Sequence, residues 1–508
     1  MKELKRIILV FVAIVISIQS VYATNSRIAY DHNLKEKAIS EMTEAEKEIY
    51  YDSLLLDENG NELETEELST TEQYEAYYDR NNVPVKDVKE TETMAYQFNK
   101  YVDDNYDEKK IDQNDLLFKL HVGKFVYHDD TENKEINIGE RVIQGIHVKD
   151  DDIYVTQHST RGDVLIRHYR KGIFCQGKVE EYDPDGIKTY RYTEQMSDAL
   201  EMQDYMLLKS VGHGTTLVSY TSPNDGEVYF LVCAGKEKPN DDTNNTTNKI
   251  GRIKYRANTV YTGSDIQRMC KTNYATFKGK QPTGYGTLKS VIANISRDEK
   301  YVYMRVKWCV GEKSNILHTV YDLKKLDAIL ASASPMDNNL VSFKDNADAK
   351  AACVYSFDQY SSTLPANDVS AGRRNPFSFS VNPTKINILL RYNQGLAITP
   401  AGMIYNYTGD EVITNNMRFD MNKGTYPTIT RLNVKTKTVK GYKLKFELPD
   451  SWFTDDEGVV RRASLENEGM QMVTGHFYIG VSPKDGYGND TNRRVAYIFD
   501  ISNSYLSF

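Results

Sequence analysis

A short motif recurs along the chain and constrains its fold more than any other feature. Its clearest copies are Ile143–Gln157 (IQGIHVKDDDIYVTQ), Asn393–Asn406 (NQGLAITPAGMIYN) and Asn467–Ser482 (NEGMQMVTGHFYIGVS). Each copy has a polar residue, a glycine, an apolar-x-apolar stretch, a polar turn and a strand that contains a tyrosine. Weaker copies occupy Gly214–Gly235 and Ser290–Val306. Alternation on both sides of a turn predicts an antiparallel hairpin in each copy.

A further strand is expected after each copy. These strands are Asp163–Arg170, Ile250–Arg256, Ile316–Leu323, Ile429–Lys435 and Arg494–Asp500. The units recur at intervals of roughly 70–105 residues, which is typical of a repeat architecture. They favour an all-β fold, a β-propeller of about five to seven blades, because radial sheets leave only short edges. A pair of β-sandwiches is the competing fold.

Two local expectations accompany this fold. The recurring glycine should lie where the chain turns tightly between strands, since glycine adopts backbone conformations that other residues avoid. Helices should be few, with Thr193–Met206 and Leu323–Ala333 as the best candidates.

The first 23 residues have the parts of a secretory signal peptide. Met1–Arg6 (MKELKR) is basic, Ile7–Ile16 (IILVFVAIVI) is apolar throughout, and a polar stretch ends in the small residue Ala23. We expect cleavage after Ala23. An uncleaved membrane anchor is the alternative, although the apolar run is short for a span of about 20 residues. The prediction is a secreted, extracellular protein without a stable membrane span after cleavage.

Charge divides the rest of the chain into two parts. Residues 24–115 hold 10 basic and 25 acidic residues, −15, whereas residues 116–508 hold 50 basic and 46 acidic residues, +4. Sparse apolar residues predict that 24–115 is an acidic, partly helical or disordered segment, a pro-region, a shield or a linker. Residues 116–508 are the expected propeller domain. The total charge of −9 argues against a nucleic-acid partner.

The sequence lacks the motifs of common catalytic and metal sites. It contains no H-E-x-x-H, no G-x-S-x-G and no C-x-x-C. We therefore assign no catalytic residue, metal site or cofactor, and lean against an enzyme. A glycosidase, which needs two carboxylates across a sugar bond, stays open. The five cysteines are an odd number, so at least one thiol is free; buried free thiols with one or two disulfides at most are expected.

An ordered series of segments between 140 and 508 carries a family resemblance. It comprises Ile143–Arg170, Gly212–Ser219, Tyr229–Lys236, Ile250–Tyr255, Leu288–Arg305, His318–Leu323, Asn393–Tyr405, Met470–Ser482 and Val495–Ile501. In these segments the chain resembles the helveticin J family of large, secreted, heat-labile bacteriocins. The resemblance implies a protein that kills or inhibits related bacteria, and it supplies no catalytic residues. The acidic segment 24–115 and spacers such as Ser332–Asn382 depart from the family pattern.

Polar residues beside the repeated motif are the candidate ligand-binding residues. Loops over a propeller's channel are the usual place for a ligand. The candidates are Gln144, Gln157, His158, His213, Gln394 and Gln471. A ring of such groups near the axis could hold sugar hydroxyls. The alternative is that each side chain satisfies backbone groups where blades converge.

Secretion, the repeat and the ordered segments favour a helveticin-like bacteriocin that binds the envelope of related bacteria and inhibits or kills them. Its partners would be bacterial cell-envelope polymers or glycans, because a body of charge +4 attracts anionic polymers in a salt-sensitive way. Two alternatives stay open. One is a non-toxic secreted propeller lectin or adhesion module, and the other is a glycan-active enzyme.

Overall fold

A computed structural model describes most of the chain after residue 93. The described residues are 94–129, 133–138, 142–159, 162–175, 179–182, 188–191, 198–236, 247–262, 265–270, 287–310, 313–332, 341–342, 347–359, 394–400, 403–409, 413–414, 424–433, 438–449, 452, 464–484 and 495–502. The leader expected at 1–23 and residues 24–93 of the acidic segment lie outside them. Of two compact units, the second contains all described residues except 94–100 and 424, and is here called the β body.

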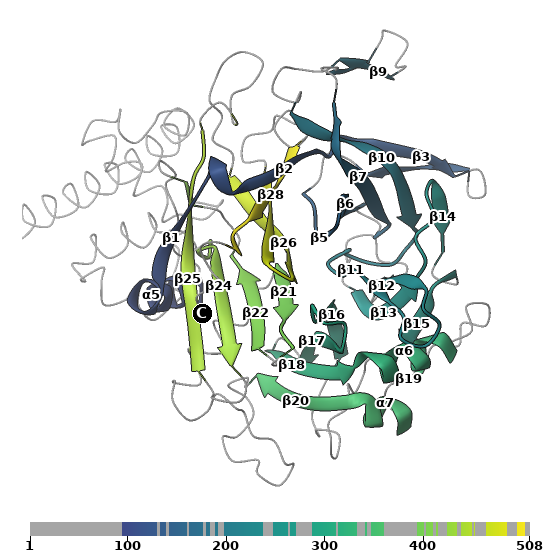
Figure 1. Ribbon diagram of the computed structural model, residues 1–508, viewed down its shortest axis with the longest axis vertical. Helices are drawn as coiled ribbons and strands as arrows, with labels where there is room; N and C mark the ends of the chain where they lie inside the picture. The colour runs from purple at the N-terminus through teal and green to yellow at the C-terminus, as the bar shows by residue number, and fades with distance from the viewer. Residues whose placement is uncertain are drawn as a thin grey trace, which may run out of the picture. The chain divides into compact units, whose positions relative to one another are not determined.

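The β body consists mainly of antiparallel strands (Figure 1). Within the described residues we divide the strands into five groups of four, and neighbours within each group run antiparallel. A short parallel pairing joins the first and fifth groups in one sheet. Group 1 contains β5 (Gly145–Lys149), β6 (Asp152–His158), β7 (Val164–Phe174) and β10 (Ala199–Leu208). Group 2 contains β11 (Leu217–Thr221), β12 (Val228–Lys236), β13 (Thr247–Ile253) and β15 (Gln267–Cys270).

The remaining groups follow in chain order, except for one strand. Group 3 contains β16 (Thr287–Ile295), β17 (Tyr301–Val310), β18 (Lys313–Asp322) and β20 (Cys353–Gln359). Group 4 contains β21 (Gly395–Ile398), β22 (Met403–Thr408), β24 (Thr428–Asn433) and β25 (Thr438–Glu447). Group 5 contains β26 (Ser464–Val473), β27 (His476–Lys484), β28 (Val495–Asp500) and β2 (Leu116–His121). Group 5 thus takes its fourth strand from the beginning of the β body.

Short elements extend these groups. Four parallel additions are β1 (Asp107–Asp112) on β25, β14 (Thr259–Tyr261) on β10, β19 (Val341–Ser342) on β15 and β23 (Ile413–Thr414) on β25. β1 lies inside the segment expected to be an acidic linker, 24–115. Two hairpins are β3 (Phe125–Asp129) with β4 (Lys134–Ile138), and β8 (Val179–Tyr182) with β9 (Lys188–Arg191). The helices are α5 (Met94–Asn105), η2 (Gln113–Asp115), α6 (Leu323–Ser332) and α7 (Ala347–Ala352).

The helices are short. Within the part of the chain that the structure describes, none has the length and apolar character needed to cross a lipid bilayer.

The hairpins expected from the repeat are confirmed. The first two strands of each group coincide with one copy of the motif, from β5 and β6 in the first copy to β26 and β27 in the last. The third strands, β7, β13, β18, β24 and β28, overlap the five strands expected after the copies. The all-β class is therefore confirmed for the described residues.

The first strands of the five groups contact one another in a closed order. β5 contacts β11, β11 contacts β16, β16 contacts β21, β21 contacts β26, and β26 contacts β5. In Figure 1 these strands lie toward the middle of the β body, with the other strands of their groups outside them.

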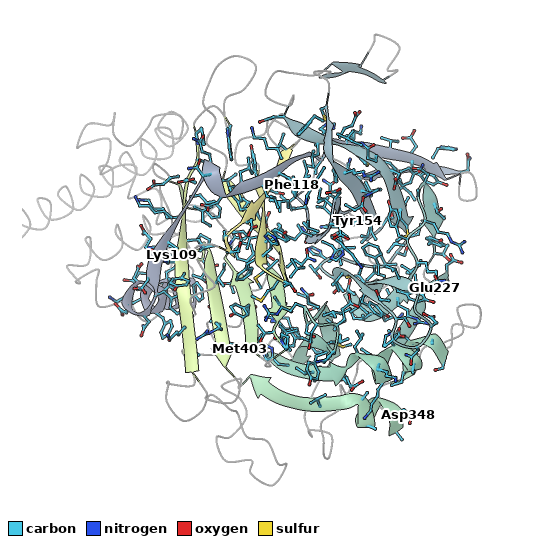
Figure 2. All side chains as sticks on the ribbon, in the orientation of Figure 1. Lys109, Phe118, Tyr154, Glu227, Asp348 and Met403 are labelled. Carbon is cyan, nitrogen blue, oxygen red and sulfur yellow. The ribbon has the colours of Figure 1, made fainter. Side chains whose placement is uncertain are left out.

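Apolar clusters lie between successive groups. Figure 2 shows side chains filling the spaces between the strands. Each cluster combines residues from two neighbouring groups, including the pair formed by groups 5 and 1. In β17, Val302, Met304 and Val306 belong to the cluster shared with group 2, whereas Tyr303 belongs to the cluster shared with group 4. Successive residues of a strand point to opposite faces. The apolar-Tyr-apolar pattern therefore arises because both faces of these sheets are buried.

The expected role of the repeated glycine is wrong for two copies. Gly145 and Gly395 lie within first strands and not in turns. A Cβ on Gly395 would lie 2.6 Å from the Cβ of Met470 and 2.7 Å from its backbone nitrogen. These glycines are needed because a neighbouring first strand, or the loop before it, approaches closely. Gly469 differs, since its φ of 77° lies in the left-handed region that favours glycine.

One of the two expected helices is wrong. Most of Thr193–Met206 that the structure describes forms β10, which pairs with β7 along Leu200–Leu208. Its Glu, Met and Leu residues favour helix, but burial between strands overrides that weak preference. The helix expected at Leu323–Ala333 is confirmed as α6. Asp322 Oδ1 accepts a hydrogen bond from the Lys325 backbone N–H at 3.0 Å and caps its start.

Three cysteines are buried free thiols, as expected. They are Cys175, Cys233 and Cys353. Burial raises the pKa of Cys175 to about 12, so this thiol is unreactive at neutral pH. The side chains of Cys270 and Cys309 lie outside the described residues.

Candidate functional site

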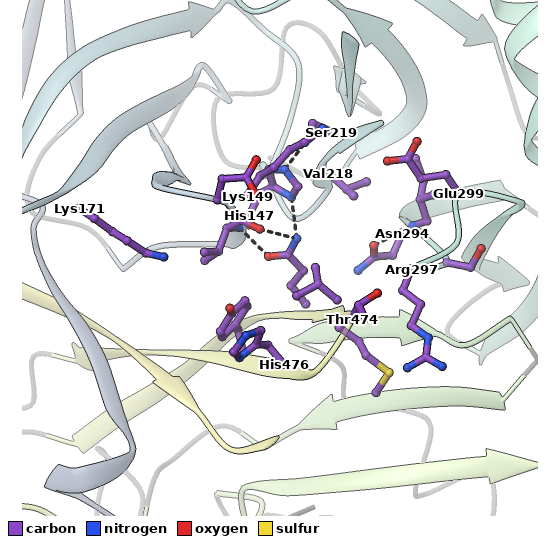
Figure 3. Close-up of a pocket in the computed structure, with 18 residues that line it drawn as sticks. His147, Lys149, Lys171, Val218, Ser219, Asn294, Arg297, Glu299, Thr474 and His476 are labelled. Carbon is purple, nitrogen blue, oxygen red and sulfur yellow. Dashed lines mark hydrogen bonds between the residues drawn. The ribbon is translucent and has the colours of Figure 1, made fainter. Parts of the chain in front are cut away.

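A polar cavity of about 400 Å³ lies at one end of the first strands. Its walls come from β5, β11, β16 and β26 and from the turns that follow β5, β16 and β26 (Figure 3). The strands of four groups therefore meet around one space. A concave site where several elements converge, with a few placed polar groups, is the usual form of a ligand-binding site.

Four polar side chains of the cavity occupy corresponding positions of the repeat. His147, Asn294 and Gln471 are the x residues of Ile-His-Val, Ala-Asn-Ile and Met-Gln-Met, and Ser219 stands between Val218 and Tyr220. The flanking apolar residues face the clusters between groups, so the x residues face the space enclosed by the first strands. Asn294 Nδ2 donates to the Leu396 carbonyl oxygen of β21, which links groups 3 and 4.

Hydrogen bonds fix the orientation of three of these side chains. The Val148 backbone N–H can only donate, and it lies 2.6 Å from Gln471 Oε1. The Gln471 amide nitrogen therefore donates to His147 Nδ1 at 2.9 Å. His147 must then carry its proton on Nε2, which donates to Ser219 Oγ at 2.7 Å. Figure 3 shows this chain of contacts.

The Ser219–His147–Gln471 chain looks like a hydrolase triad but has the wrong polarity. A triad histidine must accept the serine proton at Nε2. Here Nε2 already carries a proton, because the amide of Gln471 occupies Nδ1 as a donor. Burial and the charge of Lys149 lower the pKa of His147 to about 3, so the ring stays neutral at physiological pH. Ser219 is therefore a hydrogen-bonding group and not an activated nucleophile.

Charged side chains surround the hydrogen-bonded Ser219, His147 and Gln471 side chains of the cavity. Lys149, Lys171 and Arg297 contribute positive charge, and Asp150 and Glu299 contribute negative charge. Lys171 Nζ lies 3.9 Å from an Asp151 carboxylate oxygen outside the cavity lining.

The wall formed by β27 adds a histidine and a tyrosine. His476 stacks on Tyr478 with ring centroids 5.4 Å apart, and its Nδ1 lies 2.6 Å from Asp500 Oδ2. Burial alone would raise the pKa of Asp500, but hydrogen bonds from Ser502 and His476 outweigh it and lower this pKa. Burial and the nearby Asp500 raise the pKa of Tyr478 to about 12. Tyr478 therefore keeps its phenolic proton and can act as a donor.

Two of the expected glutamines join neighbouring groups. Gln144 Nε2 donates to Glu468 Oε1 at 3.1 Å, which connects group 1 to group 5. The Gln394 carbonyl oxygen accepts from the Gly469 backbone N–H at 2.9 Å, which connects group 4 to group 5. The Gln144 contact is with a side chain and the Gln394 contact uses its backbone carbonyl, so neither is the expected contact of a glutamine side chain with backbone groups. Neither residue lines the cavity, and their role in ligand binding stays a prediction.

Gln157, His158 and His213 lie at the end of the strands opposite the cavity. Gln157 is fully buried and accepts a hydrogen bond from Arg167. The rings of His158 and His213 lie side by side, with centroids 4.3 Å apart. The His213 backbone N–H donates to Thr247 Oγ1 at 3.0 Å. The structure thus brings His158 and His213 together, but of the six candidates only Gln471 lines the cavity.

Most residues of the cavity were missed because the candidates were chosen near the repeated glycine and at the end of one strand. The missed residues include His147, Lys149, Ser219, Asn294 and Arg297. A polar residue at the centre of an apolar-x-apolar stretch was the available signal. Lys149 and Arg297, which lie in or beside the hairpin turns, had no such signal.

The cavity offers donors and charges, and no metal-binding arrangement. Among the described residues, no group of three His, Cys, Asp or Glu side chains is placed to hold a metal ion. Its chemistry is that of a site for a hydroxyl-rich or charged ligand, since hydroxyl, amide, ammonium and guanidinium groups converge there.

No protein-family model and no curated protein matches the chain. Among solved structures, it is similar to the polysaccharide lyase Uly1, with 10% identity and a TM-score of 0.29 over 76% of this chain and 99% of that chain. It is also similar to Drosophila Semaphorin 2a, with 10% identity and a TM-score of 0.24 over 71% of this chain and 63% of that chain. Both TM-scores are too low to carry an argument about function.

Proposed function

We propose that the β body is a five-bladed β-propeller whose cavity binds a glycan of the bacterial envelope, and that the secreted protein is a helveticin-like bacteriocin. The closed order of the five first strands supports the blade number. So does the pairing of β2 with β28, because a strand from the start of the chain then completes the last sheet.

The observation that carries the binding proposal is the cavity of about 400 Å³ with its orientated polar lining. His147 and Gln471 are almost fully buried, and their mutual hydrogen bonds hold them in place. Preorganised polar groups reduce the entropy that a binding site loses on complex formation. The antibacterial part of the proposal rests on the resemblance of the repeat segments to helveticin J.

A bulky substitution at an exposed position of the cavity should weaken ligand binding without unfolding the protein. Thr474 is exposed and lines the cavity. We expect the mature protein to bind isolated cell walls and to lower viable counts in a panel of related bacteria. Thr474→Trp should lose at least about tenfold in wall affinity, since it fills the site. Wall pulldown and viable counts are the measurements.

Val228→Trp is the matched control for this experiment. Val228 is 47% exposed and does not line the cavity, so the same indole is added elsewhere. Equal binding by both variants would contradict a role for the cavity. Wall binding that leaves every strain of the panel alive would favour the lectin or adhesion alternative. Release of shortened glycan would favour the enzyme.

Removal of residues 24–93 should strengthen binding to anionic walls. This segment holds 7 basic and 19 acidic residues, and the cut leaves β1 in place on β25. Loss of this negative charge reduces repulsion, so we expect an affinity gain of about tenfold near 10 mM salt that disappears near 1 M salt. A salt series of wall pulldowns measures it. Unchanged binding at low salt would show that the segment is only a spacer.

A further inference from the structure

The orientation of the cavity's central hydrogen bonds determines what Ser219 can do. Its oxygen receives the His147 Nε2 proton, so its own hydroxyl proton must point elsewhere. Within the described residues no acceptor for that proton is found. Ser219 lines the cavity and is almost fully buried. A ligand oxygen at this position would therefore receive a hydrogen bond.

Two cations of the cavity have no carboxylate partner among the described residues. They are Lys149 at the end of β5 and Arg297 in the turn after β16, and both are exposed. Figure 3 shows Lys149 beside His147, and Arg297 beside Asn294 on the other side of the view. Charged groups on two walls can hold one anion between them, with hydrogen bonds of roughly twice the neutral strength.

Among the described residues, neither carboxylate of the cavity forms an ion pair with Lys149 or Arg297. Glu299 Oε2 already accepts a hydrogen bond from the Thr221 backbone N–H at 2.9 Å. Asp150 follows Lys149 in the turn after β5, where its φ of 55° makes the backbone bend sharply. Lys171 lies 3.9 Å from Asp151, so the preference for a negative ligand depends on Lys149 and Arg297.

We propose that this cavity selects an anionic sugar unit, whose carboxylate or phosphate oxygens are held by Lys149, Arg297 and the hydroxyl of Ser219. The inference rests on the proposed glycan-binding function and adds the charge of the bound unit. The neutral His147 ring fixes Ser219 as the donor.

Binding of defined polymers to the full mature protein tests the proposal. The probes are a hexamer of galacturonate, a short poly(glycerol phosphate) and a neutral glucose hexamer, measured by titration calorimetry at low salt. We expect the anionic probes to bind at least tenfold more tightly than the neutral one. Lys149→Gln and Arg297→Gln should each weaken anionic binding about tenfold, and Ser219→Ala about threefold to tenfold.

Lys254→Gln is the charge-matched control. Lys254 pairs with Glu227 in group 2 and does not line the cavity. Binding of the uronate alone, of the phosphate polymer alone or of both supports the proposal and identifies the source of the anion. Equal affinity for the neutral hexamer, or losses in the cavity variants no larger than in Lys254→Gln, would overturn it while leaving glycan binding intact.

The proposed function fails in a distinguishable way. If the protein binds neither isolated walls nor any of the three probes, the glycan-binding function itself is wrong. If walls are bound but the anionic probes are not, only the selectivity for an anionic unit is wrong. Circular dichroism of each variant, compared with the unchanged protein, shows that the lost affinity does not come from unfolding.

Discussion

Replacing Asp327 with alanine should lower the free energy of unfolding by about 3–5 kcal/mol. The Asp327 carboxylate of α6 is fully buried and forms an ion pair with Arg252 of β13, whose side chain is only 3% exposed. The substitution takes the Asp327 carboxylate away from a buried guanidinium. The expected result is a clear fall in the thermal midpoint and in the denaturant midpoint.

The same carboxylate gathers neutral donors, which adds to the cost. The Tyr220 hydroxyl donates to Asp327 Oδ1 at 2.7 Å, and the Asn224 amide donates to Asp327 Oδ2 at 2.9 Å. The Ser222 hydroxyl donates to Asp327 Oδ2 at 2.5 Å. Each buried donor without an acceptor costs about 1–3 kcal/mol, although these costs overlap with the loss of the ion pair. Asp327 therefore attaches α6, which follows β18 of group 3 along the chain, to group 2.

The Asp327 contribution should depend on acid pH. Burial alone would raise the pKa of Asp327, but its hydrogen bonds and Arg252 outweigh burial and lower the pKa. A lowered folded-state pKa gives stability that is fully present above the unfolded pKa of about 4, and that disappears as pH falls through the folded value. The stability difference between the original protein and Asp327→Ala should accordingly shrink below about pH 4.

Two further variants give the control for this experiment. Lys324→Ala changes an exposed residue of the same helix and should alter the unfolding free energy by less than about 0.5 kcal/mol. Arg252→Met combined with Asp327→Leu removes both charges and should cost less than Asp327→Ala alone. If Asp327→Ala were as stable as Lys324→Ala, the buried pair would have no role in attaching α6.

The local part of the fold could be predicted, and the pairing across the chain could not. Hairpins such as β5 with β6 follow from alternation within one short segment. The fourth strands had no comparable signal. β2 pairs with β28 although Leu116 lies near the start of the β body's sequence and Phe499 lies near its end. β10 has residues that favour helix, and its pairing with β7, β14 and β2 makes it a strand.

The same distinction explains the candidate site. Gln471 lies two residues after the repeated glycine, at the centre of Met-Gln-Met, and it does line the cavity. Gln144 and Gln394 instead immediately precede the glycine, and they connect neighbouring groups. Which residue faces a cavity depends on how successive groups pack. Successive side chains of β5 and β26 point to opposite faces, but which of these faces lines the cavity is known only after the strands and their neighbours are placed.

Gly395→Ala should destabilise the β body by about 1–3 kcal/mol or more, since it overpacks the contact between two first strands. The new methyl group would lie 2.6 Å from Met470 Cβ and 2.7 Å from Met470 N. Backbone cannot move aside as a flexible side chain does. Separation of β21 from β26 would also strain the hydrogen bond from the Gly469 N–H to the Gln394 carbonyl oxygen. Thermal and denaturant unfolding measure the effect.

Gly235→Ala is the control for this experiment. It also adds a methyl group to a strand, but it does not press on the backbone of a neighbouring strand. A Cβ on Gly235 would meet Lys249 Cδ at 2.5 Å, and the lysine side chain can rotate away at small cost. Gly395→Ala should therefore unfold at a lower temperature than Gly235→Ala. Gly395→Ala should also weaken ligand binding, because Asn294 Nδ2 contacts the Leu396 and Met470 carbonyl oxygens where β21 and β26 meet. Equal midpoints for the two variants would mean that the repeated glycine does not hold the first strands together, and its recurrence would then need another physical cause.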